Sequence, residues 1–321
     1  MAVSSVSSMS ATRDERGVAL VTVLLIVTVL TAVVARLSLS NEVWVRQVQG
    51  DGALAQADQV SRAAQHWVGM LLERDTNEFD GHTDLWARPI PPIPVDWGEL
   101  NGRVEDLQGR FNLNNLVTAE GEVDPVAHQQ FQRLLRILEL DPGIADAAVD
   151  WIDPDQTPYG GGGAEDGMYQ GRQPPYLAAN RPFGEAEEIR LLRGVDGEAW
   201  QALEPHITAL PEATGVNVNT ASPEVLAAVV EAWGSPRVAL GEAQRWAAKT
   251  SEEPFADPAT FAAQALGDGP GGETPPNLTV QTNYFLVRTE ASFGSVSRSL
   301  ATVYRRSGGE ARIIRHSTEI R

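Results

Sequence analysis

The run from Val18 to Ala35 contains eighteen residues without a charged side chain, and it constrains the fold of this chain more than any other feature. It directly follows the polar segment Arg13–Gly17. As an α-helix, such a run is about 27 Å long at about 1.5 Å per residue, close to the thickness of the hydrocarbon layer of a bilayer. The sequence therefore predicts one membrane-spanning helix, with the chain beyond about Arg36 on one side of the membrane.

A secretory signal peptide is the main alternative, but its apolar stretch has about 7–15 residues and ends at a small-x-small cleavage site. This run is longer, and helical periodicity continues beyond it, with apolar residues three and four positions apart at Ala53, Leu54, Ala57, Val60, Ala64, Trp67, Val68, Leu71 and Leu72. We therefore expect one long helix over residues 18–76. An anchor followed by a flexible linker stays open as an alternative, because Gly50 and Gly52 each weaken a helix by about 1 kcal/mol.

The net charge of −18 is concentrated in the middle of the chain. Residues 117–277 carry 26 acidic and 9 basic side chains, whereas residues 278–321 carry 3 acidic and 7 basic ones. Such an acidic block repels nucleic acid and attracts cations. The absence of cysteine excludes disulfides, thiolate metal sites and cysteine nucleophiles. Arginines lie on both sides of the apolar run, so the positive-inside rule gives no orientation.

The order of periodic segments predicts an α+β protein with an insertion. Two strands are expected at Glu99–Glu105 and Arg110–Leu113 around a turn at 106–109, and three more at Tyr284–Phe293, Ser297–Arg305 and Ala311–Ser317. Helices are expected between them, at 126–140, 144–152, 184–192, 198–203, 223–233, 239–249 and 258–265, with a loop at 153–182. This order predicts a long helix packed on a small antiparallel sheet formed by 77–116 and 278–321, with an all-α domain (117–277) inserted between strands.

Carboxylates cluster around the expected loop after the 144–152 helix: Asp150, Asp153, Asp155, Glu165 and Asp166 flank four glycines at 160–163. Clustered carboxylates on a flexible loop are the ligands that calcium prefers, although the spacing is not that of an EF-hand. The sequence predicts a calcium site with these five ligands. Helix-capping or solvated aspartates, and a glycosidase-like carboxylate pair, are the alternatives.

Two segments, Arg110–Leu116 and Gly215–Ser222, form a weak internal repeat in which a short strand precedes an Asn-x-Asn motif. Asparagine suits helix N-caps and left-handed positions. The second copy resembles the first half of a helix-hairpin-helix DNA-binding module, so an anchored DNA-binding protein is the alternative function. Its following turn, Trp233–Arg237, lacks the Gly-hydrophobic-Gly pattern and lies in the acidic block, which favours a structural use.

No pattern of catalytic residues stands out. The five histidines are scattered, and there is neither a His-x-x-x-His pair nor a P-loop. We therefore expect the chain not to be an enzyme and not to bind nucleic acid.

The N-terminus resembles the leader of type IV pilins and pseudopilins, in which a glycine, here Gly17, precedes a charge-free helix that begins at Val18. The fifth residue after that glycine is Thr22, where such subunits usually carry glutamate. The chain is similar over its whole length to the minor pseudopilin K family of the type II secretion system. This likeness rests on Thr22 and on the segments Asp106–Leu116, Asp150–Asp155, Ala164–Asp166, Pro174–Tyr176 and Val216–Ala221.

The resemblance implies that prepilin peptidase cuts between Gly17 and Val18, that the new amino terminus is methylated, and that residues 1–17 are lost. It further implies a single-pass protein of the bacterial inner membrane with most of its chain in the periplasm. There it would lie at the tip of the pseudopilus with minor pseudopilins I and J, joined through them to the major pseudopilin, and would hold calcium. A tip subunit has no neighbour whose amino terminus a glutamate would neutralise, which accounts for Thr22.

Overall fold

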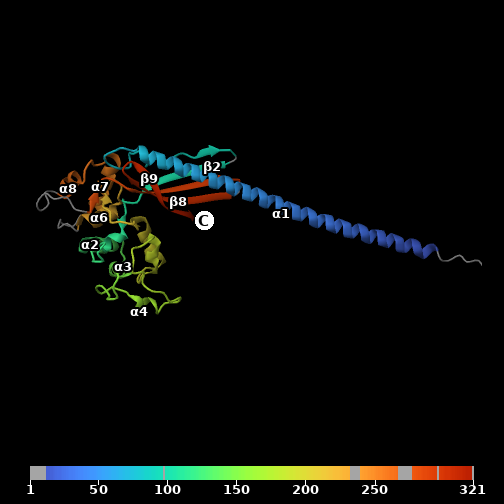
Figure 1. Cartoon of the computed structure of the whole chain (residues 1–321), viewed down its shortest axis with the longest axis horizontal. Helices are drawn as coiled ribbons and strands as arrows, with labels where there is room; N and C mark the ends of the chain where they lie inside the picture. The colour runs from blue at the N-terminus through green and yellow to red at the C-terminus, as the bar shows by residue number, and fades with distance from the viewer. Residues whose placement is uncertain (1–11, 97, 232–238, 267–276, 295, 320–321) are drawn as a thin grey trace, which may run out of the picture.

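A computed structural model describes residues 12–96, 98–231, 239–266, 277–294 and 296–319. Its longest element is helix α1 (Thr12–Arg74), which extends far beyond the rest of the molecule on one side (Figure 1). The side chains from Val18 to Ala35 are all exposed along it. The expected continuous rod is therefore confirmed, and the two glycines at 50 and 52 do not interrupt it.

The second half of α1 packs against a five-stranded antiparallel sheet. The strands follow the order β1 (Ile93–Val95), β2 (Gly98–Asp106), β7 (Tyr284–Phe293), β8 (Val296–Ser307) and β9 (Glu310–Glu319). Apolar side chains of the helix and sheet form a buried layer that includes Val68, Leu72, Trp86, Val104, Phe285, Val287 and Tyr304. Gly69 lets Tyr304 approach closely, since a Cβ on Gly69 would lie 3.3 Å from the tyrosine ring. The Tyr304 hydroxyl donates to the Gln65 carbonyl at 2.8 Å.

The insertion leaves the sheet at the end of β2 and returns before β7, and it lies at the end of the molecule away from the projecting half of α1 (Figure 1). Its α-helices are α2 (Pro125–Ile137), α3 (Ile144–Ile152), α4 (Asp166–Tyr169), α5 (Gly197–Leu203), α6 (Pro223–Glu231), α7 (Leu240–Glu252) and α8 (Pro258–Leu266). Three 3₁₀ helices join them: η1 (Leu113–Leu116), η2 (Ala186–Leu191) and η3 (Glu204–His206). Of the helix expected over 223–233, the last two residues lie outside the described residues.

The α+β class is confirmed, with one correction inside the insertion. The predicted all-α domain (117–277) also contains two short strands, β4 (Ile207–Thr208) and β5 (Val216–Asn217). Each pairs in parallel with a strand just outside these bounds: β4 with β3 (Phe111–Asn112) and β5 with β6 (Leu278–Thr279). The strand expected at Arg110–Leu113 therefore does not pair with β2 across the 106–109 turn. Its side chains Phe111 and Leu113 are buried in the insertion core, which draws this strand away from the sheet.

The weak sequence repeat corresponds to a structural repeat. In the first copy, Asn114 donates from Nδ2 to the Phe183 carbonyl at 2.9 Å and accepts from the Phe183 amide at 2.8 Å. In the second, Asn219 donates to the Phe255 carbonyl at 3.0 Å and accepts from its amide at 2.8 Å. Both side chains are buried, so the asparagines have the structural use that the sequence favoured.

Left-handed backbone was the other conformation considered for these asparagines, and neither copy adopts it. Asn112, for example, has φ −83° and caps η1. Among the described non-glycine residues, only Glu139 and Asn180 have positive φ. The turn at 233–237, on which the helix-hairpin-helix comparison depended, lies largely outside the described residues.

A buried polar network joins the insertion to the sheet where the chain crosses between them. Asp106, at the end of β2, accepts from the Thr220 hydroxyl at 2.5 Å, the Thr282 hydroxyl at 2.6 Å and Asn217 Nδ2 at 3.0 Å. Asn217 Nδ2 also donates to the Asp80 carbonyl at 3.2 Å. Burial raises the pKa of the Asp106 carboxyl, and the donors around it favour the ionised form.

The paired asparagines give a test of the repeat. Replacing Asn114 or Asn219 with Asp removes the amide donor and places a carboxylate oxygen against a buried carbonyl. We expect N114D and N219D each to destabilise the insertion by about 3 kcal/mol or more. Thermal unfolding of the full chain in detergent measures this effect. N283D, at an exposed asparagine, is the matched control. Equal melting temperatures of N114D and N283D would contradict the role assigned to Asn114.

Candidate functional site

The five predicted calcium ligands lie on three successive pieces of the insertion: helix α3, the glycine-rich loop after it, and the start of α4. Asp150 is within the last turn of α3 and Asp153 directly follows the helix. Glu165 is the residue before α4, and Asp166 is the first residue of α4. The structure divides these five carboxylates into two groups with different surroundings.

Asp150 and Asp166 bind the backbone of the loop. Asp150 accepts from the Tyr159 amide at 2.8 Å through one oxygen and from the Ala164 amide at 2.5 Å through the other. Asp166 accepts from the Ala178 amide at 2.9 Å. A Cβ on Gly163 would lie 2.6 Å from an Asp150 oxygen, so glycine is required where the loop closes over this carboxylate. The glycines are therefore used to bring the loop onto α3.

Asp146 has the same role and was missed by the sequence analysis. It accepts from the Gly162 amide at 2.9 Å, and its other oxygen lies 2.8 Å from His128 Nε2. Its position one helical turn before Asp150, on the same face of α3, is the signal that could have identified it.

Asp153, Asp155 and Glu165 form the second group. Each offers a carboxylate oxygen, and these three oxygens lie within 4.8 Å of one another. Asp153 and Glu165 are buried, while Asp155 is exposed and leaves one side of the group open. Asp153 Oδ1 and both oxygens of Glu165 are buried without a hydrogen-bond partner among the described residues.

Buried carboxylates without donors are unfavourable, and their pKa values reflect this. Burial and the neighbouring carboxylates raise the pKa of Glu165 to about 7 and that of Asp153 to about 6. A hard cation would relieve both effects, because it supplies positive charge and takes oxygen ligands from a flexible loop. The three carboxylates therefore fit a calcium ion, and Asp150 and Asp166 hold the loop that carries them.

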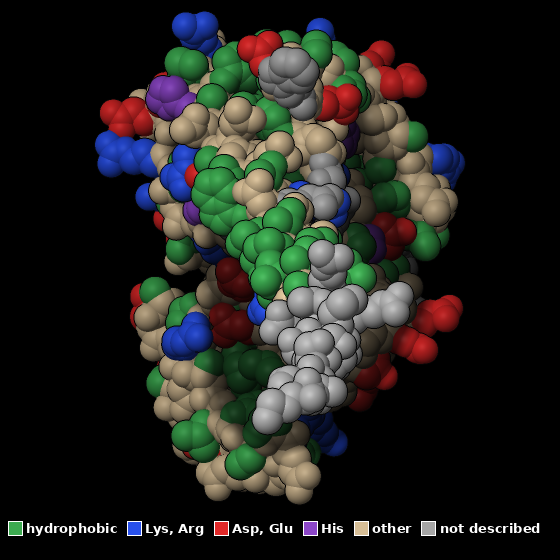
Figure 2. Space-filling view, turned by 90° about the vertical axis from the view of Figure 1, so that its right-hand side faces the viewer, with side chains coloured by type: hydrophobic (Ala, Val, Ile, Leu, Met, Phe, Trp, Pro, Cys, Tyr) green, Lys and Arg blue, Asp and Glu red, His purple; other side chains and the backbone are tan. Residues whose placement is uncertain are grey.

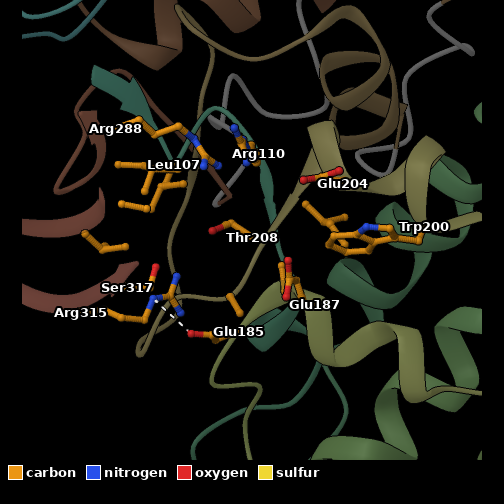
Figure 3. Close-up of a pocket in the computed structure, with 16 residues that line it drawn as sticks. Leu107, Arg110, Glu185, Glu187, Trp200, Glu204, Thr208, Arg288, Arg315 and Ser317 are labelled. Atoms are coloured by element: carbon orange, nitrogen blue, oxygen red, sulfur yellow. Dashed lines mark ion pairs between the residues drawn. The ribbon is translucent and has the colours of Figure 1, made fainter. Parts of the chain in front are cut away.

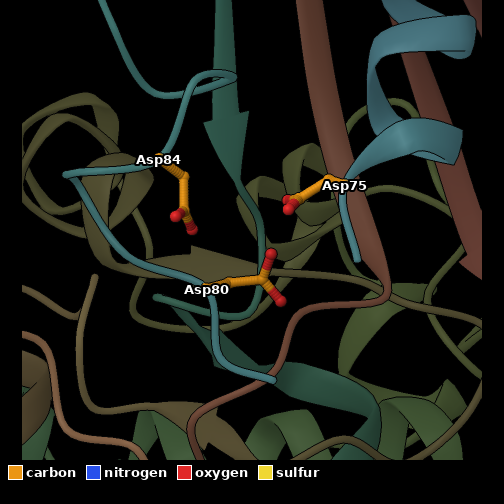
Figure 4. Close-up of side chains that lie close together, drawn as sticks. All are labelled: Asp75, Asp80 and Asp84. Atoms are coloured by element: carbon orange, nitrogen blue, oxygen red, sulfur yellow. The ribbon is translucent and has the colours of Figure 1, made fainter. Parts of the chain in front are cut away.

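A second acidic group, Asp75, Asp80 and Asp84, lies where α1 ends (Figure 4). Arg306 of β8 pairs with two of these carboxylates, with guanidinium nitrogens 3.0 Å from Asp75 and 2.6 Å from Asp80. Asp84 accepts from Asn77 Nδ2 and from the Gly81 amide, both at 2.8 Å. This group joins the end of α1 to the sheet and has no orphaned oxygens comparable to those of Glu165 among the described residues.

Helix α1 is the only described helix long and apolar enough to cross a membrane. Thr22, at the position considered above, donates its hydroxyl to the carbonyls of Val18 and Ala19 at 3.0 and 2.9 Å. Its polar group is thus satisfied within the helix, and the apolar run contains no charge.

Comparison with known proteins agrees with these features. Two models of the family described as "Type II secretion system (T2SS), protein K" match residues 109–212 and 216–281. A protein K from Pseudomonas aeruginosa is 36% identical over 94% of this chain and 92% of its own length. The chain belongs to the protein K family of the type II secretion system. A protein K from Aeromonas hydrophila is 32% identical over 92% of this chain and 94% of its own length. The two matched regions each contain one copy of the Asn-x-Asn repeat.

The fold of the family is confirmed by a solved structure. It is a chain from the crystal structure of the GspK-GspI-GspJ complex of enterotoxigenic Escherichia coli. It superposes with a TM-score of 0.71 at 24% identity and covers 86% of this chain and 100% of its own length. The expected long helix on an antiparallel sheet, with its large insertion, is therefore the fold of protein K.

Calcium titration tests the metal site. A ligand at 100 times its dissociation constant stabilises a protein by about 2.7 kcal/mol, so saturating calcium should raise the melting temperature of the full chain by several degrees. Glu165→Gln should lose most of this increase. In chelator the same variant should melt no lower than the original protein, because it removes a buried charge without donors.

Glu120→Gln is the matched control, since Glu120 is an exposed acid of the same insertion, and it should keep the full calcium effect. Equal calcium responses of the Glu165 and Glu120 variants would exclude the site. A lower melting temperature of the Glu165 variant in chelator would contradict the unpaired state of this carboxylate.

Proposed function

We propose that this chain is the minor pseudopilin at the tip of the type II secretion pseudopilus, which caps the fibre and initiates its assembly. The main support is the position of the insertion. It lies at the end of the head away from the projecting, membrane-spanning half of α1 (Figure 1). In a fibre of parallel α1-like helices, the next subunit would have to occupy that end, and the insertion would collide with it.

The uncharged anchor supports the same position. The Thr22 hydroxyl donates to a carbonyl within α1. Because threonine has no carboxylate, this position offers no negative charge to a neighbouring amino terminus. Inside an apolar helix bundle, an unpaired charge is unfavourable by several kcal/mol. A terminal subunit has no neighbour beyond it that requires such a partner.

The proposal includes the surroundings of the protein. The chain is anchored once in the inner membrane, carries its head in the periplasm, and is cut by prepilin peptidase between Gly17 and Val18 and then methylated. Its direct partners are minor pseudopilins I and J, as in the related GspK complex, and the major pseudopilin joins through them. Its calcium ion has a structural role in holding the loop between α3 and α4, and the chain neither catalyses a reaction nor binds nucleic acid.

Processing can be tested by mass spectrometry of the membrane-bound protein. Cells with prepilin peptidase should contain a chain without residues 1–17, and cells without it should contain the full chain. Gly17→Leu should block the cut because the peptidase requires a small residue there. Gly50→Leu, in open space on the same helix, should be processed normally. An uncut original protein would contradict a pseudopilin leader.

Assembly can be tested by co-purification of the full chain with the I-like and J-like subunits of the same genome, in detergent. We expect a stable complex of all three. Recovery of the chain alone, combined with salt-sensitive retardation of duplex DNA, would favour the anchored DNA-binding alternative instead.

A further inference from the structure

A groove of about 560 Å³ lies between the sheet and the insertion (Figure 3). Strands β7, β8 and β9 form one wall, and η2, α5 and η3 form the other. The base is largely apolar and includes Leu107, Ile207, Leu286, Ala301 and Val303. Neither the calcium site nor the helix–sheet core involves this groove.

The two walls carry opposite charges. Arg110, Arg288 and Arg315 lie on the side of the sheet, whereas Glu185, Glu187 and Glu204 belong to the insertion (Figure 3). One contact closes the groove at its end: Arg315 donates to the Gly184 carbonyl at 2.6 Å and lies 3.9 Å from the Glu185 carboxylate. Along the rest of the groove the acidic wall stays open, because Glu187 and Glu204 are exposed and make no hydrogen bond or ion pair with the described residues.

Two arginines of the basic wall are held in place by Glu105 of β2. Glu105 lies 2.6 Å from Arg110 and 3.3 Å from Arg288, and it also binds Arg103 at 2.6 Å. Burial opposes ionisation of Glu105, but the three guanidinium groups outweigh it and lower its pKa. Glu105 thus holds Arg110 and Arg288 next to each other in this wall, and both arginines line the groove.

The position of the groove limits what can enter it. It lies between the sheet and the insertion, and Figure 2, seen from the N-terminal end of α1, shows a hollow in the face turned toward that end, with acidic side chains beside it. The groove therefore opens toward the membrane-proximal side of the head. In a fibre of parallel helices, that side faces the subunits below and not the space beyond the tip.

We propose that this groove receives an extended segment from the head of the neighbouring pseudopilin, with a basic side chain directed at Glu187 and Glu204 and an acidic one at Arg110 and Arg288. This inference rests on the proposed function, since it requires a subunit below this one. Opposite charges on the two walls would select the segment's orientation and register. A segment with charges of only one sign would be repelled by one wall.

A double charge reversal on the acidic wall tests the contact. Both residues are exposed and have no partner in the described part of the chain, so Glu187→Arg with Glu204→Arg should leave the fold intact. We expect the full chain with both changes to bind the I-like and J-like subunits at least tenfold more weakly in detergent. Glu120→Arg with Glu252→Arg alters the net charge equally at exposed positions outside the groove, and should bind like the original protein.

Photocrosslinking identifies the occupant. A crosslinking residue at position 187 should join an I-like or J-like subunit in cells, through a peptide that carries both an acidic and a basic side chain. The same residue at position 120 should not do so. A crosslink only to an exported protein, or equal binding by the two double variants, would overturn the inference while leaving the tip function intact. Failure of the unaltered chain to bind either subunit would instead contradict the proposed function.

Discussion

The junction around Asp106 determines how this molecule is built, because about half of the chain enters and leaves the sheet there. Asp106 is the last residue of β2, and Thr282 lies just before β7. Their buried side chains hydrogen-bond to each other, and each also bonds to Asn217 of the insertion. A long insertion is inexpensive in loop entropy only if its two ends meet. Buried, mutually satisfied polar groups also define direction, since a tilted insertion would separate the Asp106 carboxylate from its donors Asn217 and Thr220. The orientation on which a cap depends therefore follows from this small network.

Elements whose signals are local could be predicted from the sequence. Helix α3 and strand β7 occupy the predicted ranges because their apolar periods of 3.6 and 2 are complete within each segment. Strand β3 has the expected position, but its partner β4 lies almost one hundred residues later, and no local pattern specifies such a pairing. The short edge strand β1 was missed for a similar reason, since two prolines flank and interrupt it and its only pairing is with β2.

The candidate metal site shows the same limit at the level of single residues. The sequence identified all five carboxylates, but only the fold distinguishes Asp150 and Asp166, which hold the loop backbone, from Glu165, whose two oxygens lack donors among the described residues. Both oxygens of Asp150 accept hydrogen bonds, from the amides of Tyr159 and Ala164, whereas neither oxygen of Glu165 accepts one from the described residues. A loop closed by the first group brings the carboxylates of the second group together in one place. A cation bound there would stabilise the insertion, because the unfolded chain offers no comparable arrangement.

The way the insertion packs beside the sheet gives the uneven charge distribution of the chain a structural consequence. The acidic insertion and the basic C-terminal strands are far apart in sequence, yet the junction places their edges on opposite walls of one groove. Complete closure would pair these walls, and a contact of this kind joins Arg315 and Glu185 at the end of the groove. Solvated charges that face each other across an open groove cost little until a partner displaces the water, and they then favour only a segment of matching sign order. The same insertion that would obstruct a subunit above thus creates, on its lower side, a surface that can discriminate between subunits below.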